Sequence, residues 1–209
     1  MVGNAISSKL VELGHEVTMG GRETGNERAL HWAGTAGERG SQSSFHGAAE
    51  FGELIVNATA GSASIRALEA AGDEHLAGKV VIDVANPIAR GSGSPPVLEL
   101  SNTESLGEAI QARFPQALVV KALNTVNATV MCDPARLPEP TSVFVCGNDE
   151  EAKSTVCGLL ADFGWDGDQI TDLGSIEAAR GTEMYLALWL RLIGVVGNPM
   201  FNVRLVRGE

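Results

Sequence analysis

The sequence predicts an α/β fold, built on a mostly parallel sheet with helices on both faces. Helical and strand patterns alternate along the chain, which is the order that produces parallel sheets. The apolar runs at residues 54–58 and 118–123 are uninterrupted, as expected of strands that are covered on both faces. The 209 residues, 44% of them hydrophobic, suffice for one large domain.

A glycine joins the first predicted helix to the first predicted strand. Ile6, Leu10 and Leu13 recur at helical spacing. Gly14 supplies the left-handed residue that ends a helix, and residues 16–19 then begin a strand. The same alternation predicts helices near residues 26–37, 45–51, 62–76, 105–114 and 150–163, and strands at residues 54–58, 79–84, 118–123, 141–146 and 169–173.

The C-terminal part forms a small helical extension. We assign residues 1–174 to the sheet domain and residues 175–209 to a C-terminal helix and tail. Residues 184–196 are the most apolar stretch, but Arg191 interrupts them and they fall short of the ~20 residues of a membrane span. The pattern therefore predicts a buried helix and no membrane contact. Residues 185–196 either wall the pocket of the second substrate or pack against a symmetry mate, and we favour a contact in a homodimer.

Charge and cysteine usage limit the class of protein. The net charge of −11 repels nucleic acid, so we expect no nucleic-acid partner. Cys132, Cys146 and Cys157 are odd in number and form no CxxC pair, and no signal-peptide pattern precedes them. We interpret all three as buried thiols of a cytoplasmic protein.

The histidines do not predict a metal centre. His15, His31, His46 and His75 are scattered, and no two of them have a spacing that places them on one helix face. We therefore expect no metal site.

The first residues resemble the end of a dinucleotide-binding loop. Val2 and Gly3 enter an amphipathic helix, and Gly3 fits the last glycine of GxGxxG, which opens the helix under the cofactor pyrophosphate. The alternative is an ordinary N-terminal helix.

The strand that follows this helix indicates which dinucleotide is bound. It ends with Gly20, Gly21 and Arg22, where NAD enzymes usually carry an acidic residue. Two glycines leave room for an additional phosphate, and Arg22 offers a planar, permanently charged fork to hold it. This pattern favours NADP. The alternative is an exposed loop arginine that pairs with Glu23.

Several motifs together resemble the NADP oxidoreductase family that uses the deazaflavin coenzyme F-420, over nearly the whole chain. These motifs are Val2-Gly3, Leu13-Gly14-His15-Glu16-Val17, Gly20-Gly21-Arg22, Asn57-Ala58-Thr59, Val84-Ala85-Asn86-Pro87, Val120-Lys121-Ala122-Leu123-Asn124-Thr125, residues 144–148 and Gly181-Thr182-Glu183-Met184. The resemblance implies a Rossmann-type doubly wound fold, with a strand and a Gly-x-Gly turn of about eight residues ahead of Met1. We therefore expect the sheet to lack its first strand.

The resemblance also implies the chemistry and the cofactor-binding residues. The family transfers hydride between reduced deazaflavin and nicotinamide, which requires positioning and no strong acid, so we name no catalytic residue. Residues that follow three strands are expected to border the nicotinamide, at the sheet edge where open α/β sheets bind ligands. They are Ala58, Thr59, Ala60, Asn86, Pro87, Asn124 and Thr125. The alternative for the polar ones is a side chain that satisfies loop backbone.

The deazaflavin side departs from the family pattern. Archaeal-type members carry serine and asparagine where this chain has Glu177 and Ala178, and a carboxylate is a poor neighbour for an anionic deazaflavin. Reduction of a small imine, quinone or carbonyl by NADPH stays an alternative, as does a truncated chain that binds dinucleotide without catalysis. Tyr185 is interpreted as a core tyrosine with a satisfied hydroxyl. The pair Lys121 and Asn124 is interpreted as a coincidental match to β-hydroxyacid dehydrogenases.

An absent central strand has an energetic consequence. Burial of each Val, Leu or Ile contributes roughly 1.5 to 3 kcal/mol, so about four such residues approach a typical domain stability of about 5 to 15 kcal/mol. We expect this chain to be marginally stable or prone to aggregation.

Overall fold

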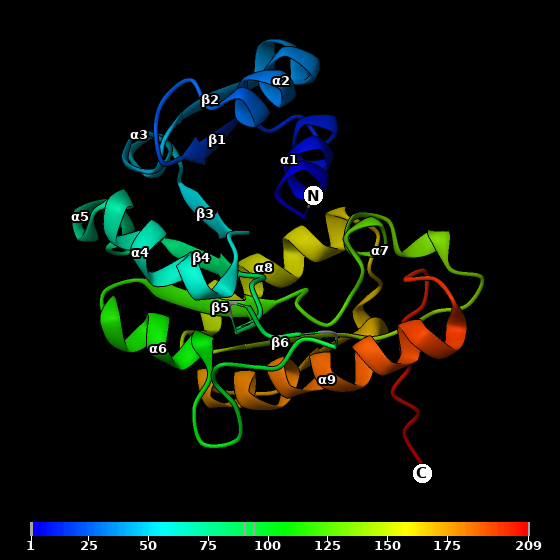
Figure 1. The fold of residues 1–209 in the computed structure, drawn as a ribbon. Helices are drawn as coiled ribbons and strands as arrows, with labels where there is room; N and C mark the ends of the chain where they lie inside the picture. Colours follow the sequence, from blue (N-terminus) through cyan, green and yellow to red (C-terminus); the bar gives the residue numbers. More distant parts are fainter. Residues whose placement is uncertain (1, 90, 94, 209) are drawn as a thin grey trace.

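The computed structural model describes residues 2–89, 91–93 and 95–208, and its strands form two sheets. The first pairs β1 (Val17–Gly21) with β2 (Gly40–Ser44) in parallel. The second has the order β3 (Leu54–Asn57), β4 (Val80–Asp83), β5 (Leu118–Ala122), β6 (Val143–Gly147) and β7 (Ile170–Asp172). Its pairs are parallel except β5 with β6. The predicted α/β fold with a mostly parallel sheet is confirmed (Figure 1).

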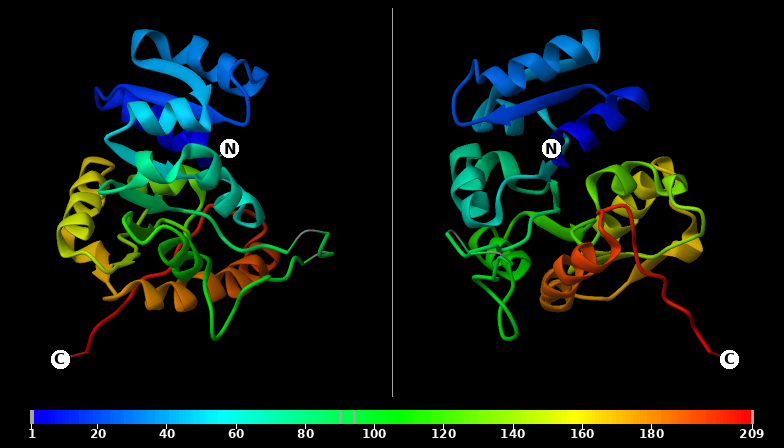
Figure 2. Two further views of the ribbon diagram at one scale, coloured as in Figure 1. Left: turned by 90° about the vertical axis from the view of Figure 1, so that its left-hand side faces the viewer. Right: turned by 45° about the vertical axis from the view of Figure 1, so that its right-hand side comes forward.

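The first three helices flank the smaller sheet. α1 (Val2–Glu12) ends before Gly14, whose φ of 96° confirms the predicted left-handed stop. α2 (Glu27–Ala36) begins at Asn26, whose side chain accepts hydrogen bonds from the first-turn amides. α3 (Phe45–Phe51) follows β2 directly. In Figure 2 these blue and cyan elements lie together at one end of the molecule.

The remaining helices surround the larger sheet. They are α4 (Gly61–Ala71), α5 (Asp73–Leu76), α6 (Leu106–Arg113), α7 (Ala128–Cys132), α8 (Glu150–Asp162) and α9 (Ala179–Val196), with short 3-10 turns η1 (Gly37–Arg39), η2 (Pro134–Arg136), η3 (Gly167–Gln169) and η4 (Ile176–Ala178). The single helix predicted at residues 62–76 is wrong, because Gly72 divides it. Gly72 has a φ of 97°, which a continuous helix cannot contain.

Two apolar clusters cover the two faces of the larger sheet. On one face Val120 and Ala122 of β5 belong to the same cluster as residues of α1, α7 and α8. On the other face Val119 of β5 lies with Leu68 of α4 and Ile110 of α6. Successive residues of β5 thus pack against helices on opposite faces of the sheet, as expected of a strand that is covered on both faces.

The C-terminal helix corrects one prediction. Only the first half of α9 is buried, through Ala179, Thr182, Glu183 and Leu186. Leu188 is 54% exposed and Val195 is 85% exposed, so the expected buried helix is instead half exposed. None of the helices in the described part of the chain is both long and apolar enough to cross a membrane.

The tail after α9 returns to the larger sheet. The Ser142 amide, next to the start of β6, donates to the Val203 carbonyl at 2.8 Å, and the Asn202 amide group donates to the Ser142 carbonyl at 2.8 Å. The tail therefore packs against the sheet domain.

The cysteines also correct the sequence interpretation in part. Cys132 and Cys146 are buried free thiols, and burial raises the pKa of Cys132 to about 11 and that of Cys146 to about 12. Cys157 is also a free thiol, but it is only half-buried. Its position on α8 leaves part of the side chain at the surface.

Candidate functional site

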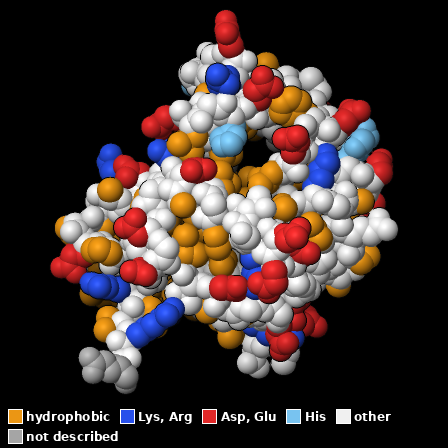
Figure 3. All heavy atoms as spheres, turned by 180° about the vertical axis from the view of Figure 1, so that it is seen from behind, with side chains coloured by type: hydrophobic (Ala, Val, Ile, Leu, Met, Phe, Trp, Pro, Cys, Tyr) orange, Lys and Arg blue, Asp and Glu red, His pale blue; other side chains and the backbone are white. Residues whose placement is uncertain are grey.

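A cavity of about 1050 Å³ separates the two sheets. Its interior is lined by apolar side chains of β1 and β3, including Val17, Met19, Leu54 and Val56. The two strands face this space without pairing to each other in the described structure. Figure 3 shows a hollow between the N-terminal elements and the rest of the molecule, with hydrophobic side chains on its walls. The cavity therefore has the shape of a gap between two parallel strands.

One end of this cavity gathers five of the predicted cofactor-binding residues. They are Gly3, Gly21, Arg22, Ala58 and Thr59. They come from the start of α1 and from the carboxyl ends of β1 and β3, where open α/β sheets bind ligands. The first amides of α1 have no partner within the helix, and they carry the positive end of its dipole. This end of the cavity suits an anionic ligand.

The start of α1 lies against the loop that follows β3. A Cβ atom added to Gly3 would lie 3.6 Å from the Ala58 Cβ, so these two residues, distant in sequence, are neighbours. The side chain of Val2 packs instead against the apolar core. Val2 can therefore contribute only backbone to this site.

Arg22 projects from the end of β1 and is exposed. It forms no ion pair within 4.0 Å with a carboxylate of the described residues, so the alternative pairing with Glu23 is wrong. Its guanidinium retains all five donors for a bound anion. The neighbouring Gly20 serves packing, because a Cβ there would lie 3.2 Å from both Phe45 and Ala48.

The Thr59 side chain is engaged within the protein. Its hydroxyl donates to the Asn57 Oδ1 at 2.7 Å, and the Asn57 amide group donates to the Asp83 Oδ1 at 2.8 Å. The Thr59 hydroxyl therefore forms a hydrogen bond within its own loop, which agrees with the alternative interpretation of this residue. Ala60 is exposed and immediately precedes α4.

Beside the cavity, the ends of β4 and β5 hold a reciprocal amide pair. Asn86 Nδ2 donates to the Asn124 carbonyl at 2.8 Å, and Asn124 Nδ2 donates to Asn86 Oδ1 at 3.0 Å. The Asn124 Oδ1 atom is buried without a hydrogen-bond partner in the described structure. A buried acceptor of this kind is costly unless a ligand donates to it. Pro87 and Thr125, the remaining predicted residues, are buried next to this pair.

The backbone before Asn124 is strained. Leu123 has a φ of 63°, although it is a branched, non-glycine residue. Such outliers cost about 1–3 kcal/mol and cluster at ligand sites. No sequence pattern indicates this residue, which lies between the end of β5 and Asn124.

A buried ionic network lies next to the carboxyl ends of β4 and β5. Lys121 Nζ lies 2.7 Å from Asp83 Oδ2 and 2.7 Å from Glu183 Oε1. Glu183 also accepts hydrogen bonds from the amides of Leu106 and Gly107 at the start of α6. Burial opposes the charge of Lys121, but the two carboxylates outweigh it and raise its pKa. Burial raises the pKa of Glu183. Lys121 and Asn124 thus have separate partners.

Glu177 and Tyr185 lie at the start of the C-terminal part and on its helix. Glu177 Oε1 lies 3.0 Å from Arg180 Nη1, so its charge is partly compensated. The Tyr185 hydroxyl is buried without a hydrogen-bond partner among the described residues, and burial raises its pKa. The prediction that its hydroxyl is satisfied is wrong, because the fold buries this atom out of hydrogen-bond reach of the described residues.

Comparisons with known proteins agree with this geometry. The family model described as NADP oxidoreductase, coenzyme F420-dependent, matches residues 1–87. The F420-dependent NADP reductase of Methanocaldococcus jannaschii is 33% identical over 120 residues, which cover 57% of this chain and 52% of that protein. The match thus spans about half the length of that relative.

Solved structures extend the likeness to the whole chain. A provisionally assigned F420-dependent NADP reductase from Arthrobacter sp. FB24 is 44% identical, with a TM-score of 0.93 over 99% of this chain and 95% of that one. A reductive aminase from Aspergillus terreus, solved with NADPH and ethyl levulinate, shares the fold alone. It has 18% identity and a TM-score of 0.62, over 94% of this chain and 59% of that one. The chain belongs to the coenzyme F420-dependent NADP oxidoreductase family.

Proposed function

We propose that this chain is an NADP-dependent oxidoreductase that transfers hydride between NADP(H) and a deazaflavin coenzyme. The observation that carries the cofactor assignment is the unpaired Arg22 guanidinium at the carboxyl end of β1, at the same end of the cavity as the first amides of α1. The guanidinium suits a 2′-phosphate and the helix amides suit the pyrophosphate.

The nicotinamide is proposed to lie beside the Asn86–Asn124 pair. The buried Asn124 Oδ1 lacks a donor, and a carboxamide NH₂ group supplies one. NADPH supplies a hydride when bound, and the residues of this edge contribute its orientation. Gly61 packs against the Asn86 carbonyl, and the strained Leu123 directly precedes Asn124. The protein's role is therefore to position two rings, in a site that requires no proton donor.

Titration calorimetry of the chain with NADPH and NADH tests the cofactor assignment. We expect Arg22→Ala to weaken NADPH binding roughly 10- to 100-fold, because charged hydrogen bonds contribute about 1.5–3 kcal/mol. NADH binding should be unchanged. Arg66→Ala is the matched control, since Arg66 is an exposed arginine of α4 outside the cavity. Equal affinities for both dinucleotides, or no effect of Arg22→Ala, contradict the proposal.

Turnover assays distinguish the second substrate. Reduction or oxidation of a deazaflavin supports the leading proposal, and the compensation of Glu177 by Arg180 removes one electrostatic objection to it. Turnover of an imine, quinone or carbonyl instead supports the alternative suggested by Glu177 and Ala178. NADPH binding without any turnover supports a non-catalytic chain.

We further propose that α9 forms the contact of a homodimer in the cytoplasm, where free thiols stay reduced. Met184, Leu188 and Val195 lie 4 and 7 residues apart along α9, and each is at least 38% exposed, so they form one apolar stripe. Light scattering after gel filtration should give a dimer that Leu188→Glu converts to a monomer. Leu173→Glu, at another exposed leucine, is the control. A monomeric parent chain contradicts this proposal.

A further inference from the structure

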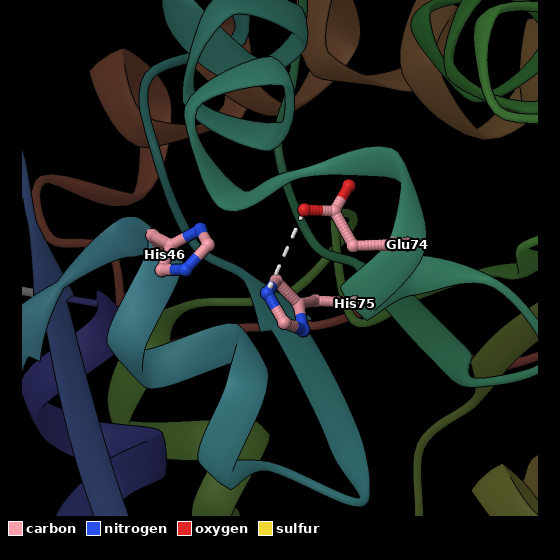
Figure 4. A group of neighbouring side chains, drawn as sticks. All are labelled: His46, Glu74 and His75. Atoms are coloured by element: carbon pink, nitrogen blue, oxygen red, sulfur yellow. Dashed lines mark ion pairs between the residues drawn. The ribbon is translucent and has the colours of Figure 1, made fainter.

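Two histidines that are distant in sequence meet on the surface. His46 belongs to α3, and Glu74 and His75 belong to α5. The possible ligand atoms of these three side chains all lie within 4.8 Å of one another. The imidazole rings are 4.5 Å apart at an angle of 85° (Figure 4). The expectation that the histidines are scattered, based on helical spacing, does not anticipate this juxtaposition.

The three side chains have their ligand atoms available. His75 Nε2 lies 3.7 Å from Glu74 Oε1, which is longer than a hydrogen bond. Within residues 2–89, 91–93 and 95–208, no hydrogen bond of 3.5 Å or less satisfies any of these three side chains. The Glu74 side chain is 69% exposed, whereas that of His75 is only 21% exposed. The Glu74 side chain thus lies largely in solvent, whereas the His75 side chain packs against the protein.

The two helices that carry the ligands are fixed relative to each other. Ala49 of α3 is 3% exposed and Leu76 of α5 is 1% exposed, and both belong to one apolar cluster. The Lys79 ammonium, just after α5, donates to the Ala49 and Gly52 carbonyls at 2.8 and 2.7 Å. Gly72 leaves space for the Glu74 carboxylate, because a Cβ there would lie 3.0 Å from Oε1. The fold therefore holds the cluster together before any ion binds.

We propose that His46, Glu74 and His75 bind one zinc ion. Two imidazole nitrogens and one carboxylate oxygen are a donor set that suits zinc, with water in the fourth position. A tetrahedral zinc ion holds its ligand atoms about 3.3–3.5 Å apart. The ligand atoms, all within 4.8 Å of one another, thus need to close by at most about 1.5 Å, which rotation of the exposed Glu74 and His46 side chains supplies.

The proposed ion links the two sheets beside the cavity. α3 directly follows β2 of the smaller sheet, and α5 leads into β4 of the larger sheet. Zinc bound to both helices favours the folded arrangement, since a ligand that binds only the native state stabilises it. At a zinc concentration about 100-fold above the dissociation constant, Tm should rise by roughly 5–10 °C.

Calorimetry with Zn²⁺ on the full, metal-stripped chain at pH 7.5 tests the site. We expect one equivalent of zinc to bind, a loss of affinity of at least about tenfold in His46→Ala and in His75→Ala, and a smaller loss in Glu74→Gln. His31→Ala is the matched control, because His31 is an exposed histidine of α2 outside the cluster. Circular dichroism without metal verifies that each variant is folded.

Two further readouts keep the proposal separate from cofactor binding. The zinc-dependent rise in Tm should vanish in His46→Ala and persist in His31→Ala. Co²⁺ bound in place of zinc should show d–d bands without a thiolate charge-transfer band. An absence of zinc binding, binding that survives both histidine substitutions, or a thiolate band overturns the proposal. None of these measurements depends on NADPH, so they test the zinc site whatever the outcome for the oxidoreductase.

Discussion

The glycine at the start of α4 shows how a single residue sets the geometry of the candidate site. A Cβ added to Gly61 would lie 2.1 Å from the Asn86 carbonyl oxygen and 3.0 Å from the Pro87 Cα. Both obstacles are backbone atoms, which no side-chain rotation can remove. The close approach of α4 to this turn therefore requires glycine, and it also fixes the Asn86 side chain that pairs with Asn124.

We expect Gly61→Ala to destabilise the chain by about 1–3 kcal/mol through overpacking, and to weaken NADPH binding because the Asn86 turn shifts. Gly158→Ala is a control that is expected to change the stability in the opposite direction. Gly158 is exposed in α8, and its added Cβ meets nothing within 4 Å, so helix propensity should stabilise the chain by about 0.5–1 kcal/mol. Urea denaturation measures both effects. A stable Gly61→Ala chain with unchanged affinity contradicts the steric argument.

At the scale of elements, an ion pair joins α6 to α9. Arg180 makes two hydrogen bonds to the Glu108 carboxylate, at 2.9 and 2.6 Å. The Glu108 side chain also accepts a hydrogen bond from Ser105 at 2.7 Å, within the N-terminal cap of α6. The hydrogen bond from Arg180, aided by Ser105, lowers the pKa of Glu108 from its usual value of 4.5. The ionised carboxylate is therefore the form that holds the helices together.

This pKa shift predicts a pH-dependent contribution to stability. Because the folded-state pKa of Glu108 is depressed, its contribution is complete above about pH 4.5 and is lost as pH falls through the lower folded value. We expect Glu108→Gln to lower Tm by about 2–4 °C at pH 7, for roughly 1 kcal/mol, and the difference from the parent to shrink as the pH falls below 4.5. Glu99→Gln, at an exposed glutamate, is the control. A Tm difference that is constant from pH 7 to pH 3 would count against the ionic clamp.

The elements that the sequence predicts are those with an apolar period. The β3 and β5 strands and the end of α1 at Gly14 follow from local patterns. β2 (Gly40–Ser44) is not predicted, because its sequence GSQSS has no apolar alternation and it forms through pairing with β1. The exposure of the second half of α9 is also a property of packing, since the same apolar sequence fits a buried helix.

The residues of the candidate site also fall into two groups, those that local sequence predicts and those that depend on tertiary contacts. Gly3, Gly21, Arg22, Ala58 and Thr59 are found by their positions at strand ends, which local sequence encodes, and the structure brings them to one end of the cavity. The orphaned Asn124 oxygen, the strained Leu123 and the His46–His75 contact depend on segments that meet only in the fold. No spacing rule within one helix or strand reports such contacts.

At the scale of the whole molecule, the two sheets are separated by a gap between β1 and β3. Among the described residues, β1 and β3 each pair on one side only, and the cavity of about 1050 Å³ lies between their other edges. α3 bridges the gap, since it packs against β1 on one side and α4 on the other. Unpaired strand edges and exposed apolar walls are features that promote aggregation. The gap is therefore expected to lower the stability of the fold.

A designed N-terminal extension tests this view of the gap. An apolar strand of about five residues and a Gly-x-Gly turn, fused ahead of Val2, should pair with β1 and β3 and should bury about four side chains between them. At roughly 1.5–3 kcal/mol for each buried residue, the gain raises Tm by more than about 10 °C and slows amide exchange in both strands. An extension of equal length with proline and serine in place of the apolar residues cannot pair, so it serves as the control. If both extended chains melted at the temperature of the parent, the cavity would not be a strand-accepting gap, and its apolar walls would need a different occupant.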